Sequence, residues 1–389
     1  MSSTAGAAVI VVGGGATGLS AAWWMAREGI DVLVLEAGVV GGEASGRNGG
    51  GCSHHFSPLF AEEQRLWPDM DALLGYPTEF QPNRMRIALD AHQMELYGRA
   101  VTNAARYGFR SDVLDAKAVR GHVPLAGGEI AGGYFYHFGG HANPHRTVQA
   151  YAWALDDQGG RLMQRTAVQG FTVEAGRVTA VQTSRGTFGC DALVLAAGPA
   201  TGRLAATLGV EVPMLTARAE MIVTEPLPLM PTGAVDGNGL YGRQTLRGNL
   251  AYGGGPHEWV EFGDGTAPKT STPLMRNISA RLARLLPGAA HAHVIRSWAG
   301  MIENTPDGRP VIERVADPSN LVVATLSSVG FGLSPASGRA IRDLVVDGAC
   351  GFADLSTLRL ARFARLERDW AAIQGWQARP DPLGAEHQV

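Results

Sequence analysis

The most constraining feature of the sequence is a short apolar segment that runs directly into a cluster of glycines. Residues 7–12 (AAVIVV) are all apolar, as expected for a buried parallel strand, and residues 13–18 (GGGATG) form a GxGxxG. A helical pattern follows over residues 19–26, and a second apolar segment, 31–35, ends at Glu36. Strand, glycine-rich turn, helix, strand and acidic residue in this order predict a βαβ unit that binds a dinucleotide.

Each position of this unit has a physical reason. The first glycine permits the tight turn, the second lets the backbone approach a pyrophosphate, and the third lets helix and strand pack closely. The positive end of the helix dipole then faces the phosphates. Glu36 is placed to accept hydrogen bonds from a ribose diol. The residues expected at the pyrophosphate are Gly13, Gly15, Ala16, Thr17 and Gly18.

Composition excludes several other classes. The 52 glycines among 389 residues show no three-residue period, which excludes collagen, and the 45% apolar content excludes disorder. A net charge of −3 gives no sign of a nucleic-acid or anionic-membrane partner. The three cysteines are far apart and offer no disulfide framework or metal site. With neither a membrane-length apolar run nor a signal-peptide pattern, we expect a soluble cytoplasmic protein.

The residues after the second strand favour FAD over NAD. Residues 36–50 read EAGVVGGEASGRNGG and resemble the second motif of the D-amino-acid oxidase-like flavoprotein superfamily, which runs beneath the FAD in that family. Nicotinamide enzymes have no such glycine-rich extension after the acidic residue. The resemblance implies additional FAD contacts at Ala37, Ala44, Ser45, Arg47, Asn48, Gly49 and Gly50.

Further segments resemble this superfamily in the same order along the chain. They are Asn143-Pro144, residues 166–168 (TAV), 191–198 (DALVLAAG), 298–310 (WAGMIENTPDGRP) and 330–338 (GFGLSPASG). The last of them looks like the family's loop before the final helix. The chain is therefore identified as a member, most similar in look to sarcosine oxidase β, D-hydroxyproline dehydrogenase and opine dehydrogenase subunits. The resemblance implies FAD contacts at Val168, Ala197, Gly198, Gly300, Gly330, Phe331, Gly332 and Leu333.

The motif order also implies the architecture. We expect an α/β fold in which a Rossmann-like FAD-binding domain is interleaved with an α+β substrate domain built on an antiparallel sheet. Alternating stretches such as 219–224 (AEMIVT) and 250–252 (LAY) are consistent with strands of that second domain. The expected boundaries are 1–82, 141–214 and 299–389 for the FAD-binding domain, and 83–140 and 215–298 for the substrate domain.

The cofactor supplies the difficult chemical step, since a flavin accepts a hydride from a carbon next to nitrogen and leaves an imine. The resemblance therefore implies oxidation of a small amine or amino acid. The family's oxidases use a lysine near the flavin to speed reaction with oxygen, and that position falls at or near Ala251; a second falls at Gly332. The absence of lysine from both positions favours a dehydrogenase that uses an acceptor other than oxygen. The alternative is a true oxidase that makes hydrogen peroxide, in which Arg243 or Arg247 serves instead.

Candidates for substrate contact follow from the same motifs. His54 or His55 comes a few residues after the flavin-contacting segment, where relatives place a histidine or arginine. Tyr252 and Arg243 lie on strands that roof the flavin in the family, and an arginine there suits a carboxylate; Arg84 and Arg86 are weaker candidates, with a solvated surface as the alternative.

Three histidines, His137, His141 and His145, do not make a metal site in our interpretation, because glycines interrupt any helix that would align them. We expect them on a surface loop. Cys52 is able in principle to carry covalent flavin, but the position where relatives attach it is Gly300, so we predict non-covalent FAD. A last alternative is a flavin-binding subunit active only within a hetero-oligomer. No cysteine cluster for an iron–sulfur centre is present, so such an electron relay needs another chain.

Overall fold

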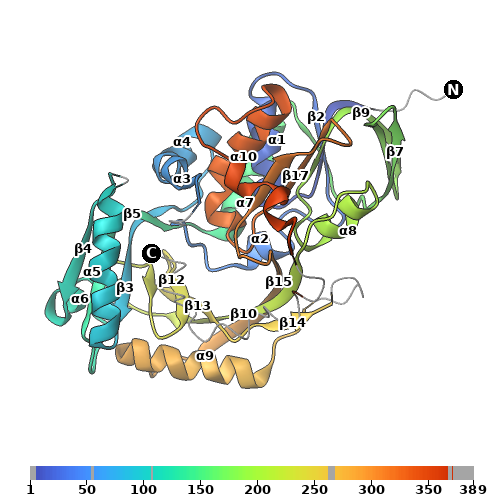
Figure 1. Ribbon diagram of the computed structural model, residues 1–389. Helices are drawn as coiled ribbons and strands as arrows, with labels where there is room; N and C mark the ends of the chain where they lie inside the picture. Colours follow the sequence, from blue (N-terminus) through green and yellow to red (C-terminus); the bar gives the residue numbers. More distant parts are fainter. Residues whose placement is uncertain (1–5, 54–56, 107, 262–267, 367–369, 371–389) are drawn as a thin grey trace.

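The computed structural model describes residues 6–53, 57–106, 108–261, 268–366 and 370. Its strands form three sheets of eight, five and four strands. In Figure 1 the largest sheet and its helices occupy the upper right, while the two smaller sheets extend below and to the left. The α/β fold with a second, largely antiparallel part is confirmed.

The eight-stranded sheet contains the predicted βαβ unit. Its strand order is β16-β17-β9-β1-β2-β6, and the β7–β8 hairpin joins it through β9. The strands are β1 (Ala7–Val12), β2 (Val32–Leu35), β6 (Arg161–Met163), β7 (Val168–Glu174), β8 (Arg177–Thr183), β9 (Gly186–Leu195), β16 (Val311–Arg314) and β17 (Leu321–Thr325). Strand β1 runs parallel to β2 and β9, with Val12 paired to Leu35 and Leu195, so the carboxyl ends of these strands meet at one edge.

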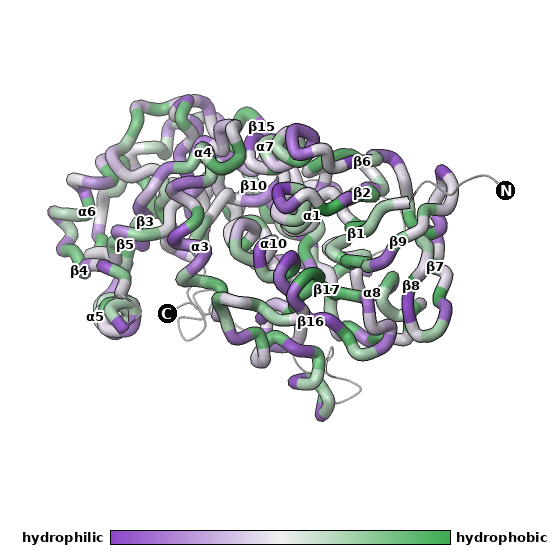
Figure 2. The backbone as a smooth tube through the Cα atoms, turned by 90° about the horizontal axis from the view of Figure 1, so that it is seen from above, coloured by the Kyte–Doolittle hydropathy of each residue, from purple (hydrophilic) through white to green (hydrophobic). Residues whose placement is uncertain are grey.

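Helices that pack against this sheet include α1 (Ala16–Ala26), α7 (Pro144–Asp157) and α10 (Gly330–Val346). Both views show α1 and α10 next to one another (Figures 1 and 2). Trp23 is buried between helices and contacts Tyr151 of α7 at 6.0 Å between ring centroids. Asn143 caps α7 by accepting the Arg146 N–H, as its position before Pro144 favours.

One expectation about this region is wrong. The family resemblance places a loop at residues 330–338, before the last helix, but α10 begins at Gly330, so these residues form its first turns. Pro335 lies inside α10, beyond its first turn, so it has no N–H to donate to the Phe331 carbonyl.

The two smaller sheets form the rest of the molecule. The strands of the four-stranded sheet are β3 (Gln81–Ala88), β4 (Ser111–Asp115), β5 (Gly132–His141) and β11 (Val235–Asp236), in the order β11-β3-β5-β4. The helices α5 (Ala91–Arg106) and α6 (Ala116–His122) pack against this sheet. The five-stranded antiparallel sheet packs against α9 (Thr272–Leu285); its strands are β10 (Leu215–Pro226), β12 (Leu240–Gln244), β13 (Asn249–Gly254), β14 (Glu258–Val260) and β15 (Val294–Asn304).

Short helices connect these layers: α2 (Ala44–Arg47), α3 (Phe60–Leu66), α4 (Met70–Leu74) and α8 (Thr201–Ala206), with 3₁₀ turns at Trp67–Asp69, Gly198–Ala200, Pro287–Ala289, Ser356–Leu358 and Leu360–Phe363. Strand β15 pairs with β10 along its length and also contacts α2, so it touches both parts of the molecule. Within the described ranges, no helix is both long enough and apolar enough to cross a bilayer.

Candidate functional site

The glycine-rich turn between β1 and α1 leaves no space for side chains. Gly13 has a φ of 115°, and a Cβ there would fall on the carbonyl oxygen of Ala196, just after β9. A Cβ at Gly18 would fall on the carbonyl oxygen of Gly13. Both positions therefore require glycine, because helix, turn and neighbouring strand are in backbone contact. The turn sits at the carboxyl edge of the parallel strands, where ligands of such sheets bind.

Glu36 lies at the same edge, directly after β2. Its two carboxylate oxygens accept the N–H groups of Gly14 at 2.7 Å and Gly38 at 2.6 Å. Each carboxylate oxygen has a second lone pair, so Glu36 retains the capacity to accept from a hydroxyl. The backbone carbonyl of Glu36 also accepts the Thr166 N–H at 2.8 Å, which brings the segment leading to Val168 and β7 close to Ala37.

The second glycine-rich segment folds back over the start of α1. Its short helix α2 presents Ser45, whose Oγ accepts the Ala16 N–H at 2.9 Å. Arg47 links α2 to β15, since its Nη1 donates to the Ala299 carbonyl at 3.0 Å and its own carbonyl accepts the Trp298 Nε1–H at 2.8 Å. Asn48 then turns the chain by accepting the Gly50 N–H at 2.7 Å.

The remaining sequence motifs meet at this edge. Gly300 lies on β15 against Arg47. A Cβ added at Gly300 would be 3.3 Å from the Cβ of Arg47. A Cβ added at Gly330, at the start of α10, would likewise be 3.3 Å from the Thr17 Oγ1. The N-terminal ends of α1 and α10 are therefore adjacent. Two helix N-termini close together favour an anionic ligand. The other residues named from the motifs lie on the same segments: Ala44 begins α2 and Gly49 follows it, Ala197 and Gly198 follow β9, and Phe331, Gly332 and Leu333 lie in the first turn of α10.

Arg243 extends from β12 toward the second glycine-rich segment. Its Nη1 donates to the Gly49 carbonyl at 2.6 Å, and the side chain is buried. Burial lowers the pKa of Arg243 to about 10. Among ion pairs between described residues Arg243 has no carboxylate partner; Glu79 acts on it through space but pairs with Arg146 at 3.5 Å. A buried guanidinium in this state is well suited to a carboxylate.

Tyr252 lies on β13, opposite Gly242 of β12 and Ile222 of β10. The side chain is fully buried, and burial raises its pKa above the ordinary tyrosine range. Its hydroxyl has no hydrogen-bond partner among the residues that the structure describes. A buried hydroxyl without a partner is costly, so it marks a place where a ligand or water group fits.

Arg84 and Arg86 lie on β3, and both face Asp236 of β11. Arg84 binds the Asp236 Oδ2 through Nε at 2.9 Å and Nη2 at 2.6 Å, and donates from Nη1 to the Ser53 Oγ at 3.1 Å. The Arg86 Nε is 3.8 Å from the same oxygen. Sequence reasoning named the two arginines but missed Asp236, because a lone aspartate before a turn carries no distinctive signal.

The three histidines do not lie on a surface loop, so that expectation is wrong. His137 and His141 belong to β5, and His145 begins α7. His141 is buried; this burial, together with the charges of Arg243 and Arg84, lowers its pKa to about 3. Side chains alternate along a strand, so glycines next to a histidine do not imply a loop. No cluster of three metal-ligating side chains occurs within the described part of the chain.

His54, like His55, lies outside the described residues. Cys52 is a free, fully buried cysteine whose Sγ donates to the Gly50 carbonyl at 3.4 Å. Burial raises the pKa of the Cys52 thiol well above its usual range, which keeps it in the unreactive thiol form.

The fold and this edge define a dinucleotide-binding oxidoreductase, and comparison with known proteins specifies the class. The chain matches the family described as FAD dependent oxidoreductase over residues 8–344 and belongs to that family. The beta chain of sarcosine oxidase from Rhizobium meliloti is 28% identical over 92% of this chain and 88% of its own. Glycine oxidase of Pseudomonas putida is 29% identical over 87% of this chain and 94% of its own.

Solved structures show the same fold. L-proline dehydrogenase from P. horikoshii is 22% identical with a TM-score of 0.86, covering 93% of this chain and 99% of its own. The chain is therefore an FAD-dependent oxidoreductase, and the family resemblance inferred from the motifs is confirmed. The individual FAD contacts and domain boundaries remain predictions.

Proposed function

We propose that this protein uses non-covalently bound FAD to oxidise a carbon–nitrogen bond of a small amino acid or related amine to an imine. When bound, FAD supplies hydride acceptance at its N5 atom. The chain's own residues hold the cofactor, bind the substrate and exclude water. The product imine hydrolyses after release.

The adjacent N-termini of α1 and α10 carry this proposal. They lie at the carboxyl edge of the parallel strands, with the side-chain-free turn at Gly13 and Gly18 between strand and helix. This arrangement fits a diphosphate, because partial positive charge and close backbone approach meet there. Glu36 is placed for the adenosine ribose, and the segment from Ala44 to Gly50 for the flavin. In the same proposal, residues 1–82, 141–214 and 299–389 bind FAD, and residues 83–140 and 215–298 shape the substrate site.

The substrate is proposed to carry a carboxylate. Arg243 is buried, touches the segment assigned to the flavin through Gly49, and has no carboxylate partner among the described ion pairs. Arg84, by contrast, is already neutralised by Asp236 at 2.6 Å. A substrate carboxylate at Arg243 compensates a charge that is otherwise costly to bury. Tyr252 stays a candidate with a hydroxyl unpartnered among the described residues, but it follows Ala251 on β13 and so projects to the opposite face of the sheet from Arg243. His54 stays a third candidate.

The electron acceptor is proposed to be a molecule other than oxygen. Ala251, which takes the position of the oxidases' lysine, is 4% exposed and provides no charge. Lys117 lies on α6 and Lys269 precedes α9, so neither lysine is on β12 or β13. Arg247 is exposed on the turn after β12, which removes it as a substitute. Arg243 remains as the alternative source of charge, and a true oxidase is the competing function.

Relatives named as parts of larger enzymes favour a second possibility, that full activity requires a hetero-oligomer. The beta chain of sarcosine oxidase and one of the opine oxidase subunits, both from Rhizobium meliloti, match most of this chain. Dye-linked turnover by the isolated chain would exclude this possibility.

One set of measurements tests the proposal. Purified protein is expected to be yellow and to release its FAD on acid precipitation; colour that stays in the pellet would contradict non-covalent binding. Dye reduction is expected to exceed peroxide formation by about tenfold or more, a difference in barrier of about 1.4 kcal/mol. Peroxide formation at the rate of dye reduction would identify an oxidase.

A further inference from the structure

A buried carboxyl group lies at the same edge of the sheet, apart from the residues proposed above to bind FAD and substrate. Glu303 is on β15, paired with Thr216 of β10, and is 8% exposed. Its Oε1 accepts from the Thr325 Oγ1 and from the Leu326 N–H, both at 3.3 Å. Because β17 ends at Thr325, the carboxyl lies beside the ends of the parallel strands.

Within the described part of the chain, no cation compensates this group. The elements packed against β15 and β17 carry other charges: Arg218, Glu220 and Glu225 on β10, Arg47 on α2, Arg203 on α8, Arg339, Arg342 and Asp343 on α10, and Glu313 and Arg314 on β16. None of them is among the interactions that shift the pKa of Glu303, which burial raises above the usual glutamate range. A buried carboxyl without a cation favours its neutral form.

The surroundings of Glu303 include the nucleotide loop. An ideal Cβ at Gly198, whose φ is 55°, would be 3.9 Å from the Glu303 Oε2 and meets no other atom within 4 Å. The neighbouring Asn304 is buried, and its Nδ2 has no hydrogen-bond partner among the described residues. A carboxyl oxygen is therefore present beside open space at Gly198, and the next residue along β15 carries that unpartnered amide nitrogen.

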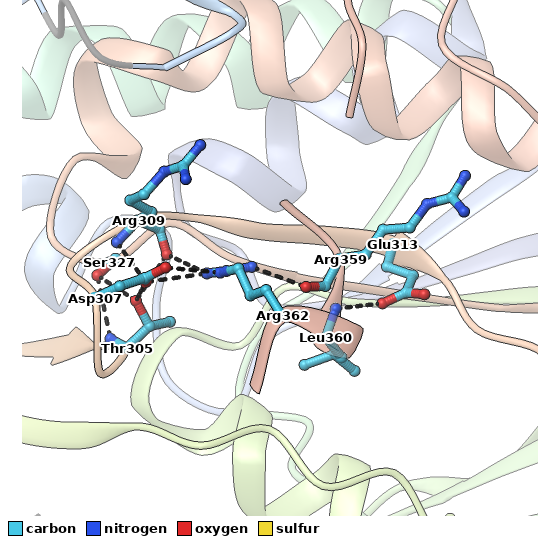
Figure 3. A network of polar contacts seen from close by, with 8 residues as sticks. All are labelled: Thr305, Asp307, Arg309, Glu313, Ser327, Arg359, Leu360 and Arg362. Atoms are coloured by element: carbon cyan, nitrogen blue, oxygen red, sulfur yellow. Dashed lines mark hydrogen bonds and ion pairs between the residues drawn. The ribbon is translucent and has the colours of Figure 1, made fainter. Parts of the chain in front are cut away.

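The adjacent loop is held in an unusual conformation. Ser327 and Ser328 have φ values of 48° and 71°, which residues other than glycine rarely adopt. Figure 3 shows the contacts that fix this loop: the Ser327 Oγ accepts the Thr305 N–H at 3.1 Å, and Arg362 binds Asp307 at 2.8 Å. The Ser328 Oγ donates to the Glu303 carbonyl at 3.1 Å. These hydrogen bonds tie the loop to Glu303 and to Thr305, on either side of Asn304.

We propose that Glu303 contacts FAD in its neutral form and donates a hydrogen bond from its carboxyl group to an oxygen of the ribityl–diphosphate part. This inference rests on the proposed placement of FAD at Gly198. An ionised carboxylate would repel the diphosphate, whereas a carboxyl O–H pairs with an acceptor oxygen. Asn304 donates from its Nδ2 to the same part of the cofactor.

The consequence is a pH-dependent affinity for FAD. FAD binds the protonated protein better, so its affinity is constant while Glu303 is protonated and falls as pH rises through the Glu303 pKa of the FAD-free protein. Where Glu303 of the FAD-free protein is ionised, its carboxylate takes up one proton when FAD binds. Each pKa unit by which FAD raises this pKa corresponds to a tenfold change in affinity at high pH. We expect the dissociation constant of FAD to be lowest at acidic pH and to rise about tenfold as Glu303 loses its proton.

The test follows FAD release from the diluted holoenzyme by the recovery of flavin fluorescence. Wild-type protein is compared with Glu303→Gln, which retains an N–H donor and cannot ionise, and with Glu211→Gln, an exposed control. At about pH 6, Glu303→Gln is expected to bind FAD within about threefold of wild type, and its affinity is expected not to change with pH. A constant wild-type affinity, or equal pH dependence in wild type and Glu303→Gln, would overturn the proposal. So would loss of FAD from Glu303→Gln at low pH, which would mean that a carboxylate acceptor is required.

A second pair of variants separates this inference from the placement of FAD. Gly198→Ala is compared with Gly209→Ala, because both glycines have positive φ values and no backbone or side-chain atom closer than 3.9 Å to an added Cβ. The placement predicts weaker FAD binding for Gly198→Ala alone. Equal FAD affinity in the two variants would refute the placement, and with it the role of Glu303. If Gly198→Ala binds FAD more weakly but Glu303→Gln keeps the pH dependence of the wild-type protein, only the role of Glu303 would be refuted.

Discussion

Arg243 lies directly opposite Ala251 on the neighbouring antiparallel strands β12 and β13. Directly paired residues project to the same face of a sheet, with Cβ atoms about 5 Å apart. The guanidinium therefore reaches the face to which a lysine at position 251 would project, and there it contacts the Gly49 carbonyl. In our proposal this buried cation binds the substrate carboxylate and does not take the lysine's role with oxygen.

Replacement of Arg243 should reduce substrate binding. We expect Arg243→Met to lower kcat/KM for an amino acid by about 100-fold, corresponding to about 2.7 kcal/mol, mainly through KM, because a charge-assisted contact is lost. The bound-flavin absorbance should be retained. Arg247→Met is the matched control, since Arg247 is exposed on the turn beyond β12. Equal losses in the two variants would contradict the assignment.

The pKa of Arg243, lowered by burial to about 10, predicts a pH dependence. A carboxylate binds the protonated guanidinium, so affinity should be constant below pH 10 and fall as pH rises through that value. The measurement is the inhibition constant of a small carboxylic acid without an amino group, which avoids titration of the substrate amine. An inhibition constant that does not change through this range would argue against Arg243 as the anchor.

The ion pair between Arg84 and Asp236 should contribute to stability. Asp236→Ala leaves a buried cation without its partner and is expected to lower the free energy of unfolding by about 3–5 kcal/mol. The double variant Arg84→Met/Asp236→Leu should lose less than the sum of the single changes. For the exposed pair Arg161–Asp31, Asp31→Ala should cost less than about 1 kcal/mol. Denaturant unfolding measures these three variants together with the single changes Arg84→Met and Asp236→Leu.

Substitution of Gly13 in the turn should cost more than substitution of another glycine with a positive φ. Gly13→Ala places a methyl group on the Ala196 carbonyl and is expected to abolish FAD binding or folding. Gly29→Ala also has an unfavourable φ, 77°, but meets no atom within 4 Å, and should cost only about 1 kcal/mol. Thermal unfolding with and without added FAD measures both, and similar behaviour would contradict the close-approach argument.

The predictable parts of this molecule are those in which local pattern and global packing coincide. The segment from β1 to Glu36 is a continuous unit whose glycines have a unique backbone function, so its structure follows from adjacent residues alone. The start of α10 at Gly330 was missed because four small or helix-breaking residues (Gly330, Gly332, Pro335 and Gly338) occur within nine positions, yet packing against α1 overrides their low propensity.

The site residues that were missed depend on contacts between distant parts of the chain. Asp236 and Arg84 are 152 positions apart and meet only because β11 pairs with β3. The burial of His141 and of Glu303 likewise results from the meeting of separate sheets. None of these residues has a sequence neighbour that signals its environment.

We propose that this chain oxidises a carboxylate-bearing amine through its FAD. The most direct measurement is anaerobic mixing of the purified yellow protein with D- and L-amino acids, N-methyl amino acids, opines, simple amines and 2-hydroxy acids, with flavin absorbance as the readout. We predict that at least one amino acid or N-substituted amino acid bleaches the flavin, and that the matching amine without a carboxylate does so far more slowly. Bleaching by a hydroxy acid alone, or equal bleaching by the amine lacking the carboxylate, would contradict the account.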